Sequence, residues 1–279
     1  MSPFFNDFLK EKRFLNNLAE NTLQSYRYAY KKFQGFGLEK SELNRFVVSL
    51  RSEGLSVGAC NVHIRSINSY LSWCFENGHT SEHLKIKLIK EHKRVVRTFS
   101  EPEVKAIITY KPKDKHELRL HTILLVLLDT GMRINECLTL ERTKVDFENL
   151  LLSVVGKGNK ERVIPFSIEL RKPLYKFLQS HKFGLVFCTR HGGKLLYRNM
   201  RRDFNTLMDK LGIKTDGAFH GFRRYYATSF IRQNGNPLIL QRLLGHSSLS
   251  MTTFHQLNTC AMPKIRKNRI VNYPLALRK

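Results

Sequence analysis

The chain has 279 residues, enough for two domains, and 42% of them are hydrophobic, which excludes wholesale disorder. Its 48 lysines and arginines outnumber 23 aspartates and glutamates, so the formal net charge is +25. Such a charge argues against an enzyme for neutral substrates and favours a polyanionic partner, because each neutralised phosphate releases counterions. The surplus is strongest after residue 93, where 34 basic residues stand against 14 acidic ones.

Cysteine usage and apolar runs indicate where the protein works. The five cysteines are odd in number and form no CxxC pair, which predicts a reduced, cytoplasmic chain without disulfides or a zinc site. Asp7 and Glu11 interrupt the apolar region of any secretory signal, and the longest apolar run, residues 123–128, is too short to cross a bilayer. His79 and His83 lack an obvious acidic partner, so we expect no metal ion and no cofactor. We also expect no membrane partner, because no segment forms a strongly amphipathic basic helix.

Residues 1–90 are predicted to form a bundle of four or five short helices. Apolar residues recur there at helical spacing, and Asn21 or Thr22 can cap the second helix. Gly54 ends the third helix and Ser56 begins the fourth.

The polar faces of these helices carry basic and amide side chains. Taken alone, they fit an ordinary solvated face, but the net charge of the chain favours contact with phosphates. The residues predicted to bind nucleic acid in this bundle are Arg27, Lys31, Arg65 and Asn68.

A basic stretch without helical periodicity, residues 91–99, is interpreted as an interdomain linker. Ser100 and Glu103 then form a capping box, which marks the start of a helix and of a second domain, residues 100–279. The next helices are expected over residues 117–129 and 133–140.

A small antiparallel sheet is expected in the middle of the second domain. Three short strand-like runs follow the helices, and the glycine-flanked turn 156–160 joins the last two as a hairpin. From Ile168 onward the pattern is again mainly helical. The predicted fold class is therefore mainly α, a helical bundle followed by an α+β domain. The expected strands are residues 144–147, 150–155 and 162–165.

The motif TGMRINE places Arg133 at the start of a helix. A helix N-terminus favours anions, and a guanidinium there can clamp a phosphate with two hydrogen bonds. Glu136, three residues further on, shares the same face and can orient the guanidinium. An ordinary surface ion pair is the alternative for this motif in isolation.

The hairpin motif GKGNKER carries Lys157 at its tip. An ammonium there can reach a DNA groove and give a proton to a departing 5′-oxygen. Lys160 and Arg162 in the same motif are predicted to bind DNA. A simple basic turn is the alternative.

Two later motifs supply histidines and a second arginine. His220 and Arg223 in HGFRR are three residues apart and share a helix face, where Arg224 is a further predicted DNA contact. His246 follows Gly245, which is expected to end the preceding helix, so that its ring can bond a phosphate oxygen. Either histidine alone is more often an ordinary surface residue.

The order of these motifs resembles that of the tyrosine recombinase (phage-integrase-like) family, in particular its short, two-domain Xer-like members. The resemblance covers nearly the whole chain and is weakest over residues 1–90, which match the helical core-binding domain by layout only. It implies an α+β catalytic domain with a small antiparallel sheet over residues 100–279. The catalytic residues that it implies are Arg133, Lys157, His220, Arg223 and His246.

The resemblance also implies a reaction and its partners. Members of the family cut one DNA strand with a tyrosine and store the bond energy in a 3′-phosphotyrosine, which needs neither a metal ion nor ATP. Four cuts on two duplexes imply a homotetramer on double-stranded DNA with paired inverted half-sites, linked by exchange of the C-terminal tail.

The expected nucleophile is the one departure from the family pattern. The family usually places its tyrosine nine positions after the last histidine, and that position is His255 here. Phe254 in the run TTFHQL fits the tyrosine position better, with Leu257 in register and one residue deleted upstream, and a phenyl ring cannot attack phosphorus. A deliberate tyrosine-to-phenylalanine substitution, a naturally inactive relative, and a role for His255 or Tyr273 all remain open. A DNA-binding regulator on the same fold and a type IB topoisomerase are the alternative functions.

Overall fold

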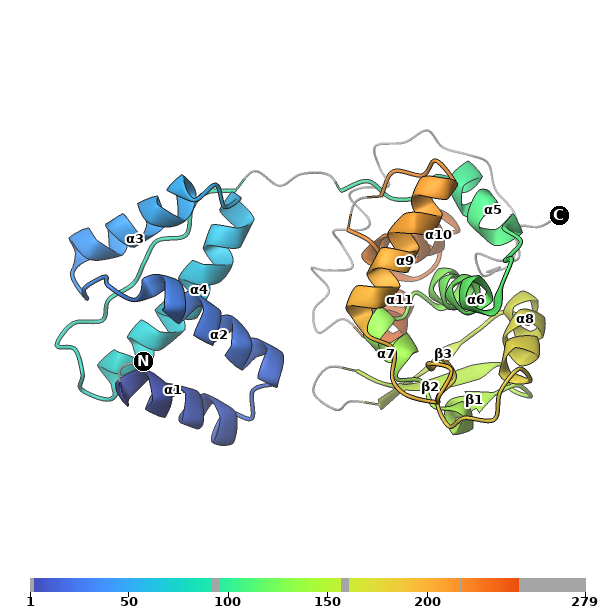
Figure 1. Cartoon of the computed structure of the whole chain (residues 1–279), viewed down its shortest axis with the longest axis horizontal. Helices are drawn as coiled ribbons and strands as arrows, with labels where there is room; N and C mark the ends of the chain where they lie inside the picture. Colours follow the sequence, from blue (N-terminus) through green and yellow to red (C-terminus); the bar gives the residue numbers. More distant parts are fainter. Residues whose placement is uncertain (1–2, 92–95, 157–160, 216, 246–279) are drawn as a thin grey trace. The chain divides into compact units, whose positions relative to one another are not determined.

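The computed structural model describes residues 3–91, 96–156, 161–215 and 217–245. The chain divides into two compact units, Met1–Arg94 and Val95–Lys279, each with its own hydrophobic core (Figure 1). The division falls inside the stretch predicted as a linker. No helix in the described ranges is long and apolar enough to span a membrane.

The first unit is a bundle of helices around an aromatic core. Phe5 stacks on Tyr30 with 3.7 Å between ring centroids, and Tyr70 meets both rings edge-on. Helix α4 contacts each of the other helices, so its apolar stripe forms the centre of the bundle. The helices are α1 (Pro3–Phe14), α2 (Glu20–Phe33), α3 (Lys40–Ser52) and α4 (Val57–Glu76).

Two of the predicted helix ends in this unit are confirmed and one helix start is wrong. Gly54 adopts a φ of +82° directly after α3, and the Ser56 hydroxyl accepts the amide of Ala59 at the start of α4. Helix α2, however, begins at Glu20 without a side-chain cap, so that Asn21 and Thr22 lie inside its first turn.

An extended segment after α4 is fastened to that helix by two asparagines. Asn61 exchanges two hydrogen bonds with the backbone of Ile89, both 2.9 Å long. Asn68 does the same with Ile86, over 2.9 and 2.8 Å. Each carboxamide therefore forms the two hydrogen bonds that a neighbouring β-strand would form with this segment. These bonds satisfy backbone N–H and C=O groups that would otherwise be buried without a partner.

The second unit is built around helix α6, which carries the longest apolar run of the sequence. Residues 123–128 are all buried, and α6 packs against α8 and α10 on different sides (Figure 1). Asp114 caps its N-terminus through the amides of His116 and Glu117. The helices of this unit are α5 (Glu101–Thr109), α6 (Lys115–Thr130), α7 (Ile134–Leu138), α8 (Ile168–Leu178), α9 (Tyr197–Lys210), α10 (His220–Arg232) and α11 (Pro237–Leu244).

A three-stranded antiparallel sheet of order β1-β2-β3 completes the unit and confirms the predicted sheet. Leu152 pairs with Ile164 and Val154 with Arg162, so one sheet face buries three apolar side chains and places Arg162 at its end. The first strand is shorter than expected, because a 3₁₀ turn η1 (Arg142–Lys144) takes up its start. The strands are β1 (Val145–Asp146), β2 (Leu151–Val155) and β3 (Glu161–Pro165).

The predicted helix over residues 133–140 is wrong in length. Only Ile134–Leu138 are helical, since Arg133 has extended backbone angles (φ −74°, ψ 145°) and Thr139 ends the helix. Leu140 then accepts the amide of Val186 and so leaves the helical path. The expectation of a mainly α chain with a small antiparallel sheet is confirmed.

Candidate functional site

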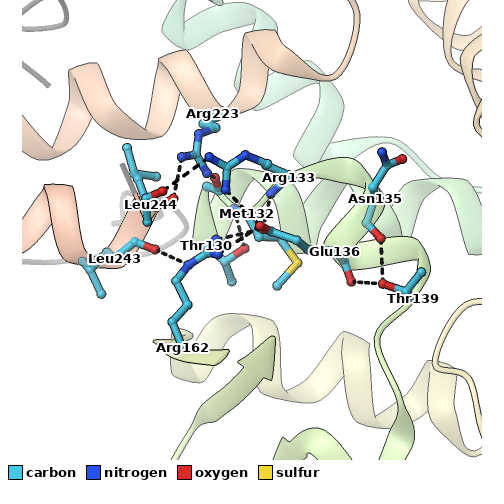
Figure 2. A network of polar contacts seen from close by, with 12 residues as sticks. Thr130, Met132, Arg133, Asn135, Glu136, Thr139, Arg162, Arg223, Leu243 and Leu244 are labelled. Carbon is cyan, nitrogen blue, oxygen red and sulfur yellow. Dashed lines mark hydrogen bonds and ion pairs between the residues drawn. The ribbon is translucent and has the colours of Figure 1, made fainter. Parts of the chain in front are cut away.

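Three arginines from different elements meet at the C-terminal end of α11 (Figure 2). Arg133 comes from the turn between α6 and α7, Arg162 from β3 and Arg223 from α10. Glu136 on α7 lies among them as the carboxylate of the cluster. Two of the arginines were predicted to hold a phosphate, whereas Arg162 was predicted to bind DNA outside that set.

The turn that presents Arg133 depends on a glycine. Gly131 ends α6 in the left-handed region with a φ of +61°, and a Cβ built there would lie 2.6 Å from the ring of Tyr226. Glycine therefore lets α6 end in close contact with α10. The Thr130 hydroxyl accepts the amide of Met132 within the turn, which directs the chain into Arg133.

Glu136 accepts four hydrogen bonds from the two neighbouring arginines. Its Oε1 accepts from Arg133 Nη1 at 3.0 Å and from Arg162 Nη1 at 2.9 Å. Its Oε2 accepts from the Arg133 amide and from Arg162 Nη2, both at 2.8 Å. Burial raises the pKa of Glu136, but these hydrogen bonds outweigh burial and hold the pKa below its ordinary value. The carboxylate is therefore ionised at neutral pH.

Arg223 is the most buried guanidinium of the cluster, with 6% of the residue exposed. Its Nη1 donates to the Gly131 carbonyl over 3.1 Å, and in the described ranges no carboxylate lies within ion-pair distance of it. Burial, together with the charge of Arg133, lowers the pKa of Arg223 to about 9. The guanidinium is thus still cationic at neutral pH, but burial makes its charged form less favourable than it would be in water.

The last carbonyls of α11 each accept a hydrogen bond from a different arginine. Leu243 accepts from Arg162 Nε at 3.0 Å, Leu244 from Arg223 Nη2 at 2.5 Å, and Gly245 from Arg133 Nη2 at 3.4 Å. These are orphan carbonyls at the negative end of the helix dipole, so cations there are favourable. The next residue in the sequence is His246.

Gly245 is needed for this arrangement. It ends α11 with a φ of +62°, as the sequence predicted, and a Cβ there would lie 3.1 Å from the Arg162 guanidinium. A larger residue would therefore strain the turn and also push against the arginine.

The cluster carries more positive than negative charge. Arg133, Arg162 and Arg223 contribute three guanidinium groups, and Glu136 is the carboxylate that contacts two of them. A buried, uncompensated positive charge is costly, and an anion would relieve it. The geometry therefore fits a site for an anion between Arg133 and Arg223, whose guanidinium groups lie side by side in Figure 2.

His220 is the first residue of α10 and is exposed to solvent. Partial burial lowers its pKa below the ordinary value, and the charges of Arg223, Arg224 and Arg133 lower it further. The imidazole is consequently neutral at pH 7, with one nitrogen free to donate a hydrogen bond and the other to accept one. It lies within electrostatic range of the cluster, as its spacing from Arg223 predicted.

Of the other predicted site residues that the structure describes, Arg224 belongs to the second unit and the remaining four belong to the first. Arg224 donates to the carbonyl of Arg97 over 3.3 Å, and Arg27 bonds Glu20 over 2.6 Å in the first unit. Lys31 and Arg65 are exposed. Asn68 pairs both ends of its carboxamide with the backbone of Ile86, which leaves one Nδ2–H for any further contact. Lys157, Lys160, His246 and Phe254 lie outside the described residues.

The link between Arg162 and Glu136 escaped the sequence analysis. Nothing in the spacing of residues 136 and 162 indicates a contact, which only the register of β3 and the end of α11 create. Within the described ranges, no group of three or more histidine, cysteine or acidic side chains is placed to hold a metal ion.

Comparison with known proteins assigns the chain to a family. The model of the phage integrase family matches residues 97–257. The tyrosine recombinase XerA of Pyrococcus furiosus is 29% identical over 86% of this chain and 85% of its own length, and that of Pyrococcus horikoshii is 30% identical over 86% and 84%. A lambda integrase dimer bound to a COC′ core site has a similar fold, with a TM-score of 0.78 and 16% identity over 96% of this chain and 99% of that one. The chain therefore belongs to the phage integrase family, the tyrosine recombinases.

Proposed function

We propose that the chain binds double-stranded DNA and holds one phosphodiester between Arg133 and Arg223. The observation that carries this proposal is the buried surplus of positive charge at the end of α11. Two guanidinium groups presented from different elements can donate to both nonbridging oxygens of one phosphate. The net charge of +25 supports a DNA partner, and so does the DNA bound by the lambda integrase of similar fold.

The proposed chemistry is strand cleavage by transesterification. In the Phe254→Tyr chain, the tyrosine hydroxyl gives its proton to solvent and its oxygen attacks phosphorus, so that a bond forms from that oxygen to phosphorus and the bond to the 5′-oxygen breaks. Lys157 gives a proton to the leaving 5′-oxygen, and the product is a 3′-phosphotyrosine. A 5′-hydroxyl of a partner strand then reverses the step.

The remaining side chains stabilise the charge that this step develops. Arg133 and Arg223 offset the negative charge that grows on the nonbridging oxygens in the pentacoordinate transition state. His220, neutral at pH 7, and His246 complete the set of hydrogen-bonding groups around the phosphate. No ATP is required, because the phosphotyrosine conserves the energy of the cleaved bond.

Phe254 sets this chain apart from an active recombinase. It retains the ring of tyrosine and lacks the oxygen, so we infer that the chain binds DNA and assembles complexes without cleaving. A non-catalytic DNA-binding regulator is the second candidate, and the missing hydroxyl favours it. The retention of Arg133, Glu136 and Arg223 in a tightly bonded cluster favours the recombinase, since binding alone does not require a clamp on a single phosphate.

The number of protomers in the complex follows from the number of cuts, because each protomer would supply one nucleophile. Exchange between two duplexes needs four cuts, so we propose a homotetramer on paired inverted half-sites. The basic C-terminal tail would link neighbouring protomers, and its charged residues are Lys264, Arg266, Lys267 and Arg269.

A selection experiment tests the proposal without any assumption about the target. Duplexes bound by the unmodified chain are recovered from a random library, and the recovered site is footprinted. We expect two inverted half-sites around a short spacer. Recovery of unrelated duplexes with no common site, or of a single undivided site, would contradict the recombinase assignment.

The Phe254→Tyr chain separates the three candidate functions on the selected site. A recombinase transfers a strand to a second duplex. A type IB topoisomerase relaxes supercoiled plasmid without transferring a strand, and a regulator does neither while still binding DNA.

A further inference from the structure

Arg162 does not have the geometry of a DNA contact, although its motif predicted one. Only 13% of its side chain is exposed. Its Nε donates to the Leu243 carbonyl, and its Nη1 and Nη2 donate to the two oxygens of Glu136. Each of the three guanidinium nitrogens thus donates a hydrogen bond of 2.8 to 3.0 Å inside the protein, which uses three of its five N–H groups and fixes its plane against Glu136 and the end of α11.

We propose that Arg162 is a positioning residue for the phosphate clamp and acts on Arg133 through Glu136. This inference rests on the proposed function, because it concerns how Arg133 is made available to a phosphate. Arg162 donates to both oxygens of the Glu136 carboxylate, and the Arg133 amide donates to Oε2, so the Arg133 guanidinium contacts that carboxylate through Nη1 alone.

Occupation of the carboxylate preserves the clamp in two ways. An arginine and a carboxylate that have no competitor form a bidentate pair, which would draw Arg133 fully onto Glu136. Arg162 hinders that pairing, and Arg133 Nη2 donates instead to the Gly245 carbonyl over 3.4 Å. The charge of Arg162 also offsets that of Glu136, so the positive charge of Arg133 is not cancelled.

Arg162 also ties three parts of the site together. It lies on β3 opposite Val154, at the base of the hairpin that contains Lys157 in its sequence. Through Leu243 it holds the end of α11, which His246 follows in the sequence. One side chain therefore joins β3, Glu136 and the C-terminal end of α11.

Arg142 provides a matched control in the same unit. Its guanidinium is also directed inward, where Nη1 donates to the His181 carbonyl at 2.7 Å and Nη2 to that of Leu178 at 2.8 Å. Arg142 therefore holds the C-terminal end of α8 in the same way that Arg162 holds the C-terminal end of α11. Neither of these two bonds involves a residue of the clamp, so Arg142→Gln reports what the loss of a structural guanidinium does by itself.

The test measures binding of uncleaved DNA by the chain as it exists, with Phe254 in place. The site recovered from the random library is made as a series of duplexes, each with one neutral methylphosphonate in place of a phosphate. At the clamped position the substitution removes charge-assisted hydrogen bonds, which costs on the order of tenfold to a hundredfold in affinity. The readout is the dissociation constant for the duplex with the methylphosphonate at that position, divided by the dissociation constant for the unmodified duplex.

We expect Arg162→Gln to reduce this ratio nearly to that of Arg133→Ala, while Arg142→Gln keeps the ratio of the unmodified chain. Replacement of Glu136 as well, in the Arg162→Gln/Glu136→Gln chain, should restore most of the ratio, because the carboxylate that captures Arg133 is gone. A merely structural role predicts the opposite, since a second buried change would lower the ratio further or leave it low.

Two results with Arg162→Gln would overturn the inference. An unchanged ratio in Arg162→Gln overturns the inference, and so does an equal loss of affinity on every duplex of the series, which would mark a direct DNA contact. If no single methylphosphonate lowers the affinity of the unmodified chain more than the others do, the proposed function fails instead.

Thermal melts report whether each variant folds, and if Arg162→Gln does not fold, Arg162→Lys is used. It keeps one ion pair with Glu136, and a ratio equal to that of the unmodified chain would overturn the inference.

Discussion

The buried guanidinium of Arg223 donates a hydrogen bond to the carbonyl of Leu244 over 2.5 Å, in the last turn of α11. The same guanidinium is the second arm of the proposed phosphate clamp. The arginine that would hold the phosphate therefore also holds the last turn of α11, which His246 follows in the sequence. The proposed phosphate binding and the end of α11 are thus linked through one side chain.

Loss of either clamp arginine should impair cleavage far more than binding. In the Phe254→Tyr chain, Arg133→Ala or Arg223→Ala should each remove about 2–4 kcal/mol of transition-state stabilisation, on the order of 30- to 1000-fold in rate. Negative charge grows on the nonbridging oxygens only as the reaction proceeds, so the dissociation constant for DNA should change much less. Single-turnover rates on a nicked duplex and equilibrium binding are compared, and equal losses in both would mean that the arginines only position DNA.

The pH dependence of DNA binding should reveal His220. Partial burial and three arginines lower the pKa of His220 in the free protein, and a bound phosphate should raise it again. The complex then takes up a proton, so affinity should rise as the pH falls below about 6.5. Calorimetry in two buffers with different ionisation enthalpies measures the uptake. Removal of the imidazole in His220→Gln should abolish most of it, and an unchanged uptake would assign it to another group.

Asp129 should make the second unit less stable as the pH rises. It is fully buried, its Oδ2 accepts the Ser167 amide at 2.7 Å, and its Oδ1 has no hydrogen-bond partner in the described ranges. Burial raises the pKa of Asp129 from 3.8 to about 6. Because the pKa is higher in the folded state, stability is greatest below about pH 4 and declines until about pH 6, by roughly 3 kcal/mol in total.

Substitution by asparagine isolates this contribution. Asp129→Asn keeps an acceptor for Ser167 and cannot ionise, although it buries an extra donor. We therefore expect the melting temperature of the variant, relative to the unmodified chain, to be higher at about pH 7.5 than at about pH 4.5. A difference that does not vary between these conditions would show that Asp129 does not titrate in this range.

The local parts of the site could be predicted from the sequence, whereas the long-range contacts could not. Arg133, Glu136 and Arg223 belong to short motifs whose spacing already indicates a helix start and a shared helix face. The bonds from Arg162 to Glu136 and Leu243 join residues that are far apart in the chain, so they depend on strand register and on how α11 packs. The periodicity of apolar residues in the sequence reports neither the strand register nor the packing of α11.

The errors in the fold have a similar cause. Residues 133–140 have a helical pattern, but the extended backbone of Arg133 and the bond from Val186 to Leu140 limit α7 to five residues. Asn68 has the exposure pattern of a surface amide, yet a backbone segment 18 residues further along pairs with it. In both cases a specific hydrogen bond overrides the tendency of the local sequence.

The most direct test of the account is covalent capture of DNA by the Phe254→Tyr chain. The account holds that the phosphate clamp is intact and that only the attacking oxygen is missing. On a nicked duplex that carries the selected site, the restored chain should form a protein–DNA adduct that survives boiling in detergent and disappears on protease treatment, while the unmodified chain should bind the same duplex and form none. An adduct with the unmodified chain would mean that another residue is the nucleophile. A restored chain that binds the duplex but never becomes attached to it would contradict the claim that the cleavage machinery is otherwise complete.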